Sequence, residues 1–187
     1  MAAHQARATV QGTICSADLA SSYRARLSSS VGRHNSENAA VDIEQFMQGY
    51  KAAWEGRDDE MFARLFLPEG RYHNTPFAVQ IGHVQLREYW NRVKLQEDVN
   101  LTYRVLSATP GAGIAHWHVT YQVASEELFQ IWARSSGTNL VSRKPGDPLP
   151  RMVLDGVLQA EFQAGKCSCC RLWWHSMPQP ASAQGAS

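Results

Sequence analysis

The sequence has little of three features that would assign it to a specialised class of protein: charge of one sign, cysteine and long apolar runs. Eighteen Lys and Arg against 17 Asp and Glu leave a formal net charge of +1 over 187 residues. This balance argues against a surface built for nucleic acid or for an anionic membrane. No segment approaches the roughly 20 apolar residues of a membrane-spanning helix. We therefore expect neither nucleic acid nor a membrane as a partner.

Cysteine is too scarce for a disulfide scaffold. Cys15 stands alone, and Cys167, Cys169 and Cys170 form a cluster. A secreted scaffold would be denser in cysteine and would follow a signal peptide, yet the first residues lead into no apolar segment. The cluster lacks the spacing of a zinc site. We predict reduced thiols, a cytoplasmic location and no metal, with a redox-active vicinal disulfide as the alternative to simple packing.

The two ends of the chain differ in composition from its middle. Residues 1–40 contain four arginines but only Asp18 and Glu37 as acids, with many Ser and Ala and no sustained apolar period. We predict a disordered N-terminal extension there, with an organelle-targeting segment as the alternative. Residues 178–187 are predicted to be a disordered tail. The expected domain therefore covers residues 41–177.

The first part of this domain has the periodicity of helices. A one-sided apolar stripe predicts a helix that ends near Gly56, formed by Ile43, Phe46, Met47, Tyr50 and Trp54. Three carboxylates from Asp58 favour the start of a second helix, in which Met61 and Phe62 should be buried. Residues 71–75 are predicted to form a short strand that ends at Pro76, and a third helix follows Gly82.

The remainder of the domain alternates with a period of two. This pattern predicts five strands, at residues 99–105, 116–123, 128–134, 152–162 and 168–177. Residues 135–150 are polar, contain Gly and Pro, and are predicted to be a loop that could act as a lid. Three helices followed by a curved, mostly antiparallel sheet indicate an α+β fold in which the helices cover one sheet face.

Segments at both ends of the domain resemble nuclear transport factor 2-like (SnoaL-like) proteins, whose fold is a cone. The opening segments are Trp54–Asp58, Leu65–Glu69, Tyr72, Pro76–Phe77, Gly82 and Tyr89–Trp90. The closing segments are Leu154–Val157, Phe162, Gly165–Cys167 and Arg171–His175. The resemblance implies kinship with ketosteroid isomerases, polyketide cyclases, dehydratases, epoxide hydrolases and non-catalytic binding modules. Membership of such a fold does not by itself define a function.

A comparison with ketosteroid isomerase tests whether the chain carries the catalytic residues of that enzyme. The resemblance places Tyr50 where the isomerase has a tyrosine that donates to an enolate. The isomerase's base is an aspartate just before a proline, whereas Thr75 precedes Pro76 here. Its second acid falls near Leu158. Two of the three positions have therefore lost their function, and a steroid-type isomerase is not expected.

Three other residues are candidates for catalysis. His73 is predicted to share a strand face with Thr75, and an unperturbed histidine pKa near 6.5 suits proton transfer. Tyr50 would be a hydrogen-bond donor and Asp155 a partner acid. The alternative for each is structural: a packed histidine, a satisfied phenol and a turn aspartate. No cofactor is expected, because no phosphate-binding loop or nucleophile elbow is present.

Aromatic residues are the main sign of a ligand. Six tryptophans exceed what packing requires, so some should line a pocket for a flat apolar molecule. The expected ligand-binding residues are Trp54, Thr75, Phe77, Trp90, Trp117 and Trp132. His116 and His118 lie on the opposite side of their strand from Trp117. They should face an outer sheet surface, through which we predict a homodimer.

Two functions remain open at this point. The first is a cofactor-independent lyase, isomerase or cyclase that acts on an apolar, polycyclic or polyketide-like substrate through Tyr50, His73 and Asp155. The second is a non-catalytic module of the same fold that binds a ligand or forms a dimeric scaffold. The loss of the family base at Thr75 favours the second function, and the placement of Tyr50 and His73 favours the first.

Overall fold

The structure, a computed structural model, describes residues 32–136 and 146–179. The predictions for residues 1–31, for the loop at 137–145 and for the tail at 180–187 lie outside the described residues. The chain divides into two units, Met1–Gly32 and Arg33–Ser187, and the fold below is that of the second unit. Within the described residues, no helix is both long enough and apolar enough to cross a membrane.

The first three predicted helices are present. They are α1 (Gly32–Glu55), α2 (Asp59–Arg64) and α3 (Gly82–Trp90), the last continued by a short 3₁₀ helix, η1 (Asn91–Leu95). Asp58 caps α2, because its Oδ1 accepts a hydrogen bond from the backbone N–H of Met61 at 2.8 Å. Two details differ from expectation: α1 begins at Gly32, inside the segment 1–40 that was predicted to be a disordered extension, and Met61 is 37% exposed.

The strands form a single six-stranded sheet in the order β2-β1-β6-β5-β4-β3. Their bounds are β1 (Phe66–Thr75), β2 (Ala78–Ile81), β3 (Gln96–Thr109), β4 (Ala112–Val123), β5 (Arg151–Gln163) and β6 (Lys166–Pro178). Among the strand pairs of the described residues, β1–β6 alone is parallel. The α+β fold with a mostly antiparallel sheet is thereby confirmed. The last strand runs to Pro178, where the tail was expected to begin.

One predicted strand is a helix. Residues 128–134 lie within α4 (Glu126–Ser136), so the strand prediction was wrong. The Ser125 hydroxyl accepts from the backbone N–H of Leu128 at 3.2 Å, and two glutamates occupy the first turn, where the helix dipole favours negative charge. Leu128 and Trp132, four residues apart, are both buried. Local capping and an i, i+4 apolar pair thus outweighed a weak alternating pattern.

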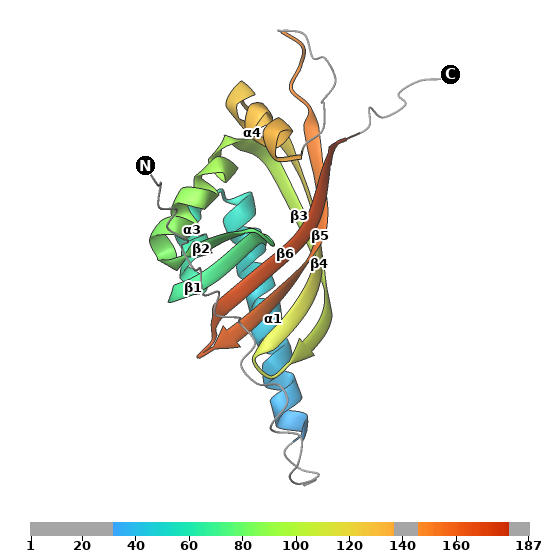
Figure 1. The fold of residues 1–187 in the computed structure, drawn as a ribbon. Coiled ribbons are helices and arrows are strands. Elements are labelled where there is room, and N and C mark those ends of the chain that lie inside the picture. The colour runs from blue at the N-terminus through green and yellow to red at the C-terminus, as the bar shows by residue number, and fades with distance from the viewer. Residues whose placement is uncertain (1–31, 137–145, 180–187) are drawn as a thin grey trace, which may run out of the picture. The chain divides into compact units, whose positions relative to one another are not determined.

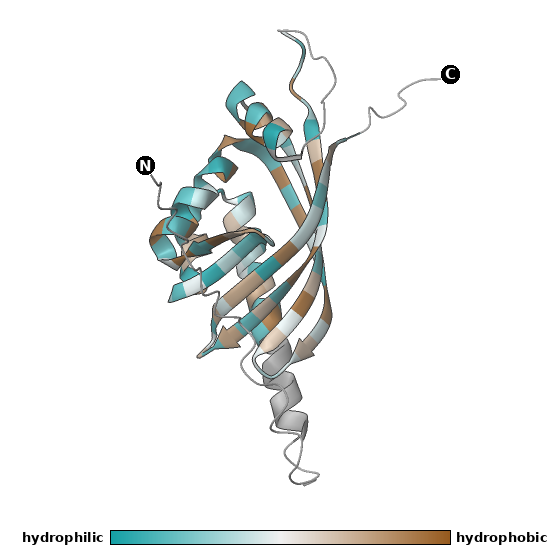
Figure 2. Ribbon diagram, viewed as in Figure 1, coloured by the Kyte–Doolittle hydropathy of each residue, from teal (hydrophilic) through white to brown (hydrophobic). Residues whose placement is uncertain are grey.

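The helices lie on one side of the curved sheet, and α1 runs along that side (Figure 1). Apolar residues alternate with polar ones along the long strands (Figure 2), as expected for a sheet with one buried face. The approach of α1 is close at Gly113 in β4, where a Cβ atom would lie 2.5 Å from the Cβ of Ile43. Glycine therefore lets the helix sit directly on the sheet.

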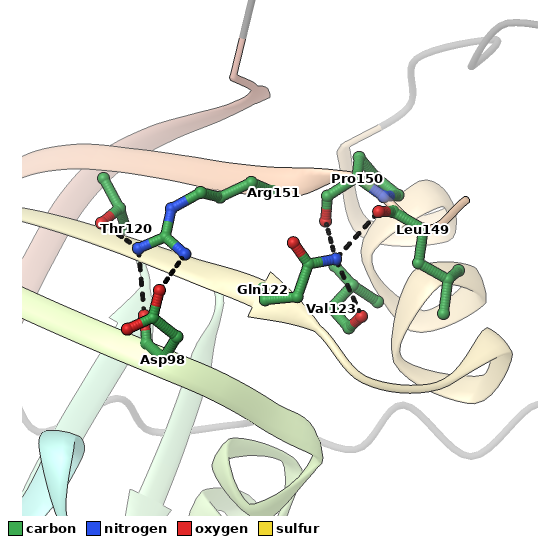
Figure 3. A network of polar contacts seen from close by, with 7 residues as sticks. All are labelled: Asp98, Thr120, Gln122, Val123, Leu149, Pro150 and Arg151. Carbon is green, nitrogen blue, oxygen red and sulfur yellow. Dashed lines mark hydrogen bonds and ion pairs between the residues drawn. The ribbon is translucent and has the colours of Figure 1, made fainter. Parts of the chain in front are cut away.

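A polar network fixes the end of the sheet that carries α4 (Figure 3). The Arg151 guanidinium donates to the Asp98 carboxylate at 2.6 Å and to the Thr120 hydroxyl at 3.1 Å, which joins β5 to β3 and β4. The Gln122 side chain donates to the carbonyl oxygen of Leu149 at 2.8 Å. These bonds hold the segment that enters β5 against the strand that leads into α4.

Candidate functional site

A cavity of about 140 Å³ lies between the helices and the inner face of the sheet. Five of the six tryptophans line it, and they come from five different elements: Trp54 from α1, Trp90 from α3, Trp117 from β4, Trp132 from α4 and Trp174 from β6. The sixth, Trp173, is 49% exposed. Large aromatic rings from so many elements make an apolar wall that no single segment of sequence reveals.

Most of the predicted ligand-binding residues belong to this wall. Trp54, Thr75, Trp90, Trp117 and Trp132 all line the cavity. Phe77 does not, and it is 99% exposed. It lies in the tight turn between β1 and β2, where Thr75 pairs directly with Ala78, so its side chain leaves the sheet rather than entering the core.

Tyr50 does not line the cavity itself, but its hydroxyl group is hydrogen-bonded to a tyrosine that does. Its hydroxyl lies 3.1 Å from that of Tyr72; Tyr72 lines the cavity, whereas Tyr50 does not. Burial raises the pKa of both phenols well above the ordinary value, so both stay neutral near pH 7. Sequence reasoning missed Tyr72 as a site residue, although it lies in the same strand as Thr75.

His73 does not line the cavity. Alternation along β1 predicted that it would share a face with Thr75, but the register with β2 shifts between Tyr72 and Thr75. Its pKa is lowered by partial burial and then by the charges of Arg171 and Arg71. Arg171 is its neighbour in β6. His73 therefore lies beside two cations, and as the next residue after Tyr72 in β1 it does not share the cavity face of the Tyr50–Tyr72 pair.

Asp155 lies on the other side of the sheet from the cavity. Its carboxylate is 3.0 Å from Nε2 of His116 and 3.1 Å from Nδ1 of His118, and its side chain is 55% exposed. Partial burial acts to raise the pKa of Asp155, but the hydrogen bonds and charges of the two histidines lower it overall. The structure brings Asp155 together with His116 and His118, and with neither Tyr50 nor His73.

The polar groups along the cavity include six side chains that can only donate, namely the five indoles and Arg92. Among the described lining residues there is no Asp, Glu, His or Lys, and the one charged group is Arg92. The Arg92 side chain lies 3.9 Å from the ring centre of Tyr89 and donates from Nε to the Tyr89 carbonyl. No imidazole or carboxylate in this lining could serve as a base.

Two buried donors on the cavity wall have no partner. The indole N–H groups of Trp90 and Trp117 make no hydrogen bond to any of the described residues, and the two residues are 2% and 1% exposed. By contrast, the indole of Trp54 donates to Gln96 at 2.7 Å and that of Trp174 to the Asn74 carbonyl at 2.9 Å. An unpaired buried donor is uncommon in native structures, because it loses its bond to water without compensation.

The three clustered cysteines do not line the cavity, although Cys170 is the β6 partner of the lining residue Tyr72. Cys167, Cys169 and Cys170 are buried in β6, Cys167 and Cys170 as free thiols. Burial raises the pKa of Cys170 well above its ordinary value, which disfavours the reactive thiolate. The described residues contain no group of three or more His, Cys, Asp or Glu arranged to hold a metal.

The curved sheet, the helices on one face and the apolar cavity between them define a protein of the cystatin-like α+β class. A family model, the SnoaL-like domain, matches residues 44–167, and the chain belongs to this family, within the nuclear transport factor 2-like superfamily. The recognition made from the sequence is thereby confirmed. No curated protein matches the sequence.

Solved structures agree on the fold. TsrD from Streptomyces laurentii is 18% identical, with a TM-score of 0.50 over 73% of this chain and 88% of that one. SalBIII, an epoxide hydrolase/cyclase-like enzyme of salinomycin pyran-ring formation, is 12% identical, with a TM-score of 0.53 over 76% and 97%. A cystatin-fold protein from Novosphingobium aromaticivorans is 16% identical, with a TM-score of 0.51 over 71% and 97%. At these identities the likeness concerns the fold alone.

Proposed function

We propose that this protein binds a compact, largely apolar small molecule in the tryptophan-lined cavity. The observation that carries the proposal is the cavity itself, about 140 Å³ in volume and walled by five tryptophans from five elements. Engineered protein cavities of about 150 Å³ bind benzene. The volume therefore favours a ligand of about one ring over the polycyclic molecule suggested by the sequence.

Binding of benzene, followed by thermal unfolding, tests this proposal. A ligand at ten times its dissociation constant adds about 1.4 kcal/mol of stability, which raises the melting temperature of a domain of this size by about 3–6 °C. Ile131 lines the cavity from α4, so Ile131→Trp should fill the space and abolish the rise. Gln130→Trp, at an exposed position of the same helix, is the matched control and should retain it. An unchanged melting temperature in the unsubstituted protein would contradict the proposal.

A second candidate function is cofactor-independent catalysis in the same cavity. It is favoured by the Tyr50–Tyr72 pair, in which Tyr50 can donate to Tyr72 while the Tyr72 hydroxyl donates into the cavity. Such a donor could stabilise negative charge on a carbonyl or epoxide oxygen, and SalBIII, which shares the fold, is an epoxide hydrolase/cyclase-like enzyme. His73 and Asp155 have no place in this version, because neither lines the cavity.

The catalytic version predicts that Tyr72→Phe lowers kcat on an epoxide or ketone substrate by at least tenfold and leaves KM almost unchanged. An interaction made chiefly in the transition state has this signature. If kcat stayed the same and only KM rose, Tyr72 would be a binding residue, and the non-catalytic version would stand.

We also propose that the outer sheet face mediates self-association. Trp173 and Met177 alternate outward along β6 and are 49% and 52% exposed. Large exposed apolar side chains on one face are typical of interaction surfaces. Analytical ultracentrifugation at micromolar concentration should show dimers, and Trp173→Glu should convert them to monomers. A monomer at all concentrations contradicts this part of the proposal.

A further inference from the structure

Arg92 is the charged residue of the described cavity lining, and its guanidinium lies against the wall. The guanidinium carbon is 3.9 Å from the centre of the Tyr89 ring, and Nε donates to the Tyr89 carbonyl oxygen at 3.0 Å. Tyr89 lines the cavity as well. Both residues are only partly buried, whereas four of the five tryptophans in the wall are buried. This part of the wall can therefore be reached from solvent.

The described part of the chain does not neutralise the positive charge of Arg92. Cations nearby in the sequence pair with carboxylates, Arg87 with Glu60 and Lys94 with Asp59. Among the described residues, no acid forms an ion pair with Arg92, and none lines the cavity. The two Nη atoms of Arg92 donate to no described residue, yet neither is among the buried unpaired atoms. Both atoms are therefore accessible to a small molecule.

A second accessible donor lines the cavity from the sheet. Tyr121 belongs to the buried inner face of β4 and lines the cavity. Its hydroxyl bonds to no described residue and is not among the buried unpaired atoms either. Burial, and then the charge of the Tyr89 phenol, raises the pKa of Tyr121, so its hydroxyl keeps its proton near pH 7 and can donate. A positive charge and a neutral donor, with no carboxylate in the described lining, favour a ligand with an anionic group.

We propose that the ligand is a compact aromatic carboxylate, whose ring lies among the tryptophans and whose carboxylate binds the guanidinium of Arg92. The inference rests on the proposed binding function and specifies the chemical class of its ligand. An arginine offers parallel N–H groups to the two oxygens of a carboxylate, so the contact is directed as well as charged. A neutral ring of the same size would occupy the cavity but leave this cation without a partner.

Benzoate and nitrobenzene test this inference on the full chain, because they have the same planar shape and differ in charge. Calorimetric titration near pH 7 gives the two dissociation constants. Raising the salt concentration from about 0.01 M to about 1 M shortens the screening length from about 30 Å to about 3 Å. Benzoate should therefore bind more weakly as the salt concentration rises, whereas the affinity for nitrobenzene should not fall.

Two variants locate the charge that benzoate binds. Arg92→Met removes the guanidinium, so benzoate should bind about tenfold more weakly or worse, the loss expected for a hydrogen bond to a charged group. Nitrobenzene should change by less than about twofold, because it carries no net charge. Lys94→Met is the matched control: it removes one positive charge from the same 3₁₀ helix, at a position that does not line the cavity. Arg92→Gln repeats the test if Arg92→Met fails to fold.

The outcomes separate this inference from the function on which it rests. If Arg92→Met weakens both probes equally, or Lys94→Met weakens benzoate as much, the cavity binds small molecules but the assignment of a carboxylate to Arg92 is wrong. The same holds if nitrobenzene binds and benzoate does not. Ile131→Trp should abolish binding of both probes, and benzoate that still binds this variant occupies another site, which overturns the inference. If neither probe binds the unsubstituted protein, the binding function is overturned and the inference with it.

Discussion

The two faces of β4 and β5 show how differently one pair of strands can be used. On the inner face, Trp117 and Leu154 line the cavity and are at most 7% exposed. On the outer face, His116 and His118 surround Asp155 in a half-exposed cluster. The inner face combines apolar walls with unpaired indole donors. On the outer face, the Asp155 carboxylate is hydrogen-bonded to both histidines.

This contrast bears on where a function can reside. Titratable groups attract attention in a sequence, yet here the carboxylate and two of the histidines satisfy one another at the surface. Among the described residues, the groups left unsatisfied include the buried indole N–H donors of two tryptophans that line the cavity. Unsatisfied buried polarity is the stronger indication of a ligand, because the protein loses stability by retaining it.

The largest expected effect distinguishes the faces by stability. Trp117→Ala should lower the free energy of unfolding by about 3–5 kcal/mol, since it removes a fully buried ring. Trp173→Ala, on the outer face, should cost less than about 1 kcal/mol in the monomer, because the side chain is half exposed. Urea unfolding of both variants measures the difference. Equal losses would show that the outer face is packed as tightly as the inner one.

The next effect concerns the backbone behind the cavity wall. Gly156→Ala should lower the free energy of unfolding by about 1–3 kcal/mol through overpacking. The new Cβ would lie 2.5 Å from the Trp173 carbonyl oxygen and 3.0 Å from the Trp117 ring. Gln163→Ala, exposed at the end of the same strand, should change stability by less than about 0.5 kcal/mol. Thermal unfolding compares the two, and the idea is wrong if Gly156→Ala is neutral.

A smaller effect is expected at the tyrosine pair inside. Tyr50→Phe should cost about 1–2 kcal/mol, because it leaves the buried Tyr72 hydroxyl without its partner. The double variant Tyr50→Phe/Tyr72→Phe should lose less unfolding free energy than the two single variants together. The difference, which is the coupling energy, should be at least about 0.5 kcal/mol. Strictly additive losses, measured by denaturant unfolding, would mean that the two hydroxyls do not stabilise each other.

The smallest effect is expected at the outer cluster. The lowered pKa of folded Asp155 means that its ionised form stabilises the fold above its unfolded pKa of about 3.9, and that this contribution disappears as the pH falls through the folded pKa. Asp155→Asn should therefore cost less than about 1 kcal/mol at pH 7. The difference from the unsubstituted protein should vanish once the pH has fallen below the folded pKa of Asp155. A pH series of urea midpoints checks this, and a pH-independent difference would exclude the ion-pair explanation.

The apolar periodicity of the sequence predicted an element and its buried face correctly wherever burial repeats with the period of a helix or a strand. The helical stripe from Ile43 to Trp54 and the alternation along β4 specified elements and faces without knowledge of their partners. The pattern failed at Leu128 and Trp132, where alternating and helical spacing were both permitted and the Ser125 cap selected the helix. It failed again at His73, because an irregular register between β1 and β2 cannot be seen in a strand read by itself.

By itself, therefore, the sequence determined the class of fold, the family resemblance, the outward placement of His116 and His118, and five of the six residues expected to line a pocket. Those features depend on periodicity, which is local. Tertiary structure decided which groups meet: Asp155 with two histidines, Tyr50 with Tyr72, and Trp90 and Trp117 with no protein acceptor. Such pairings join residues from distant strands and helices, and only the closing of the sheet around the helices brings them together.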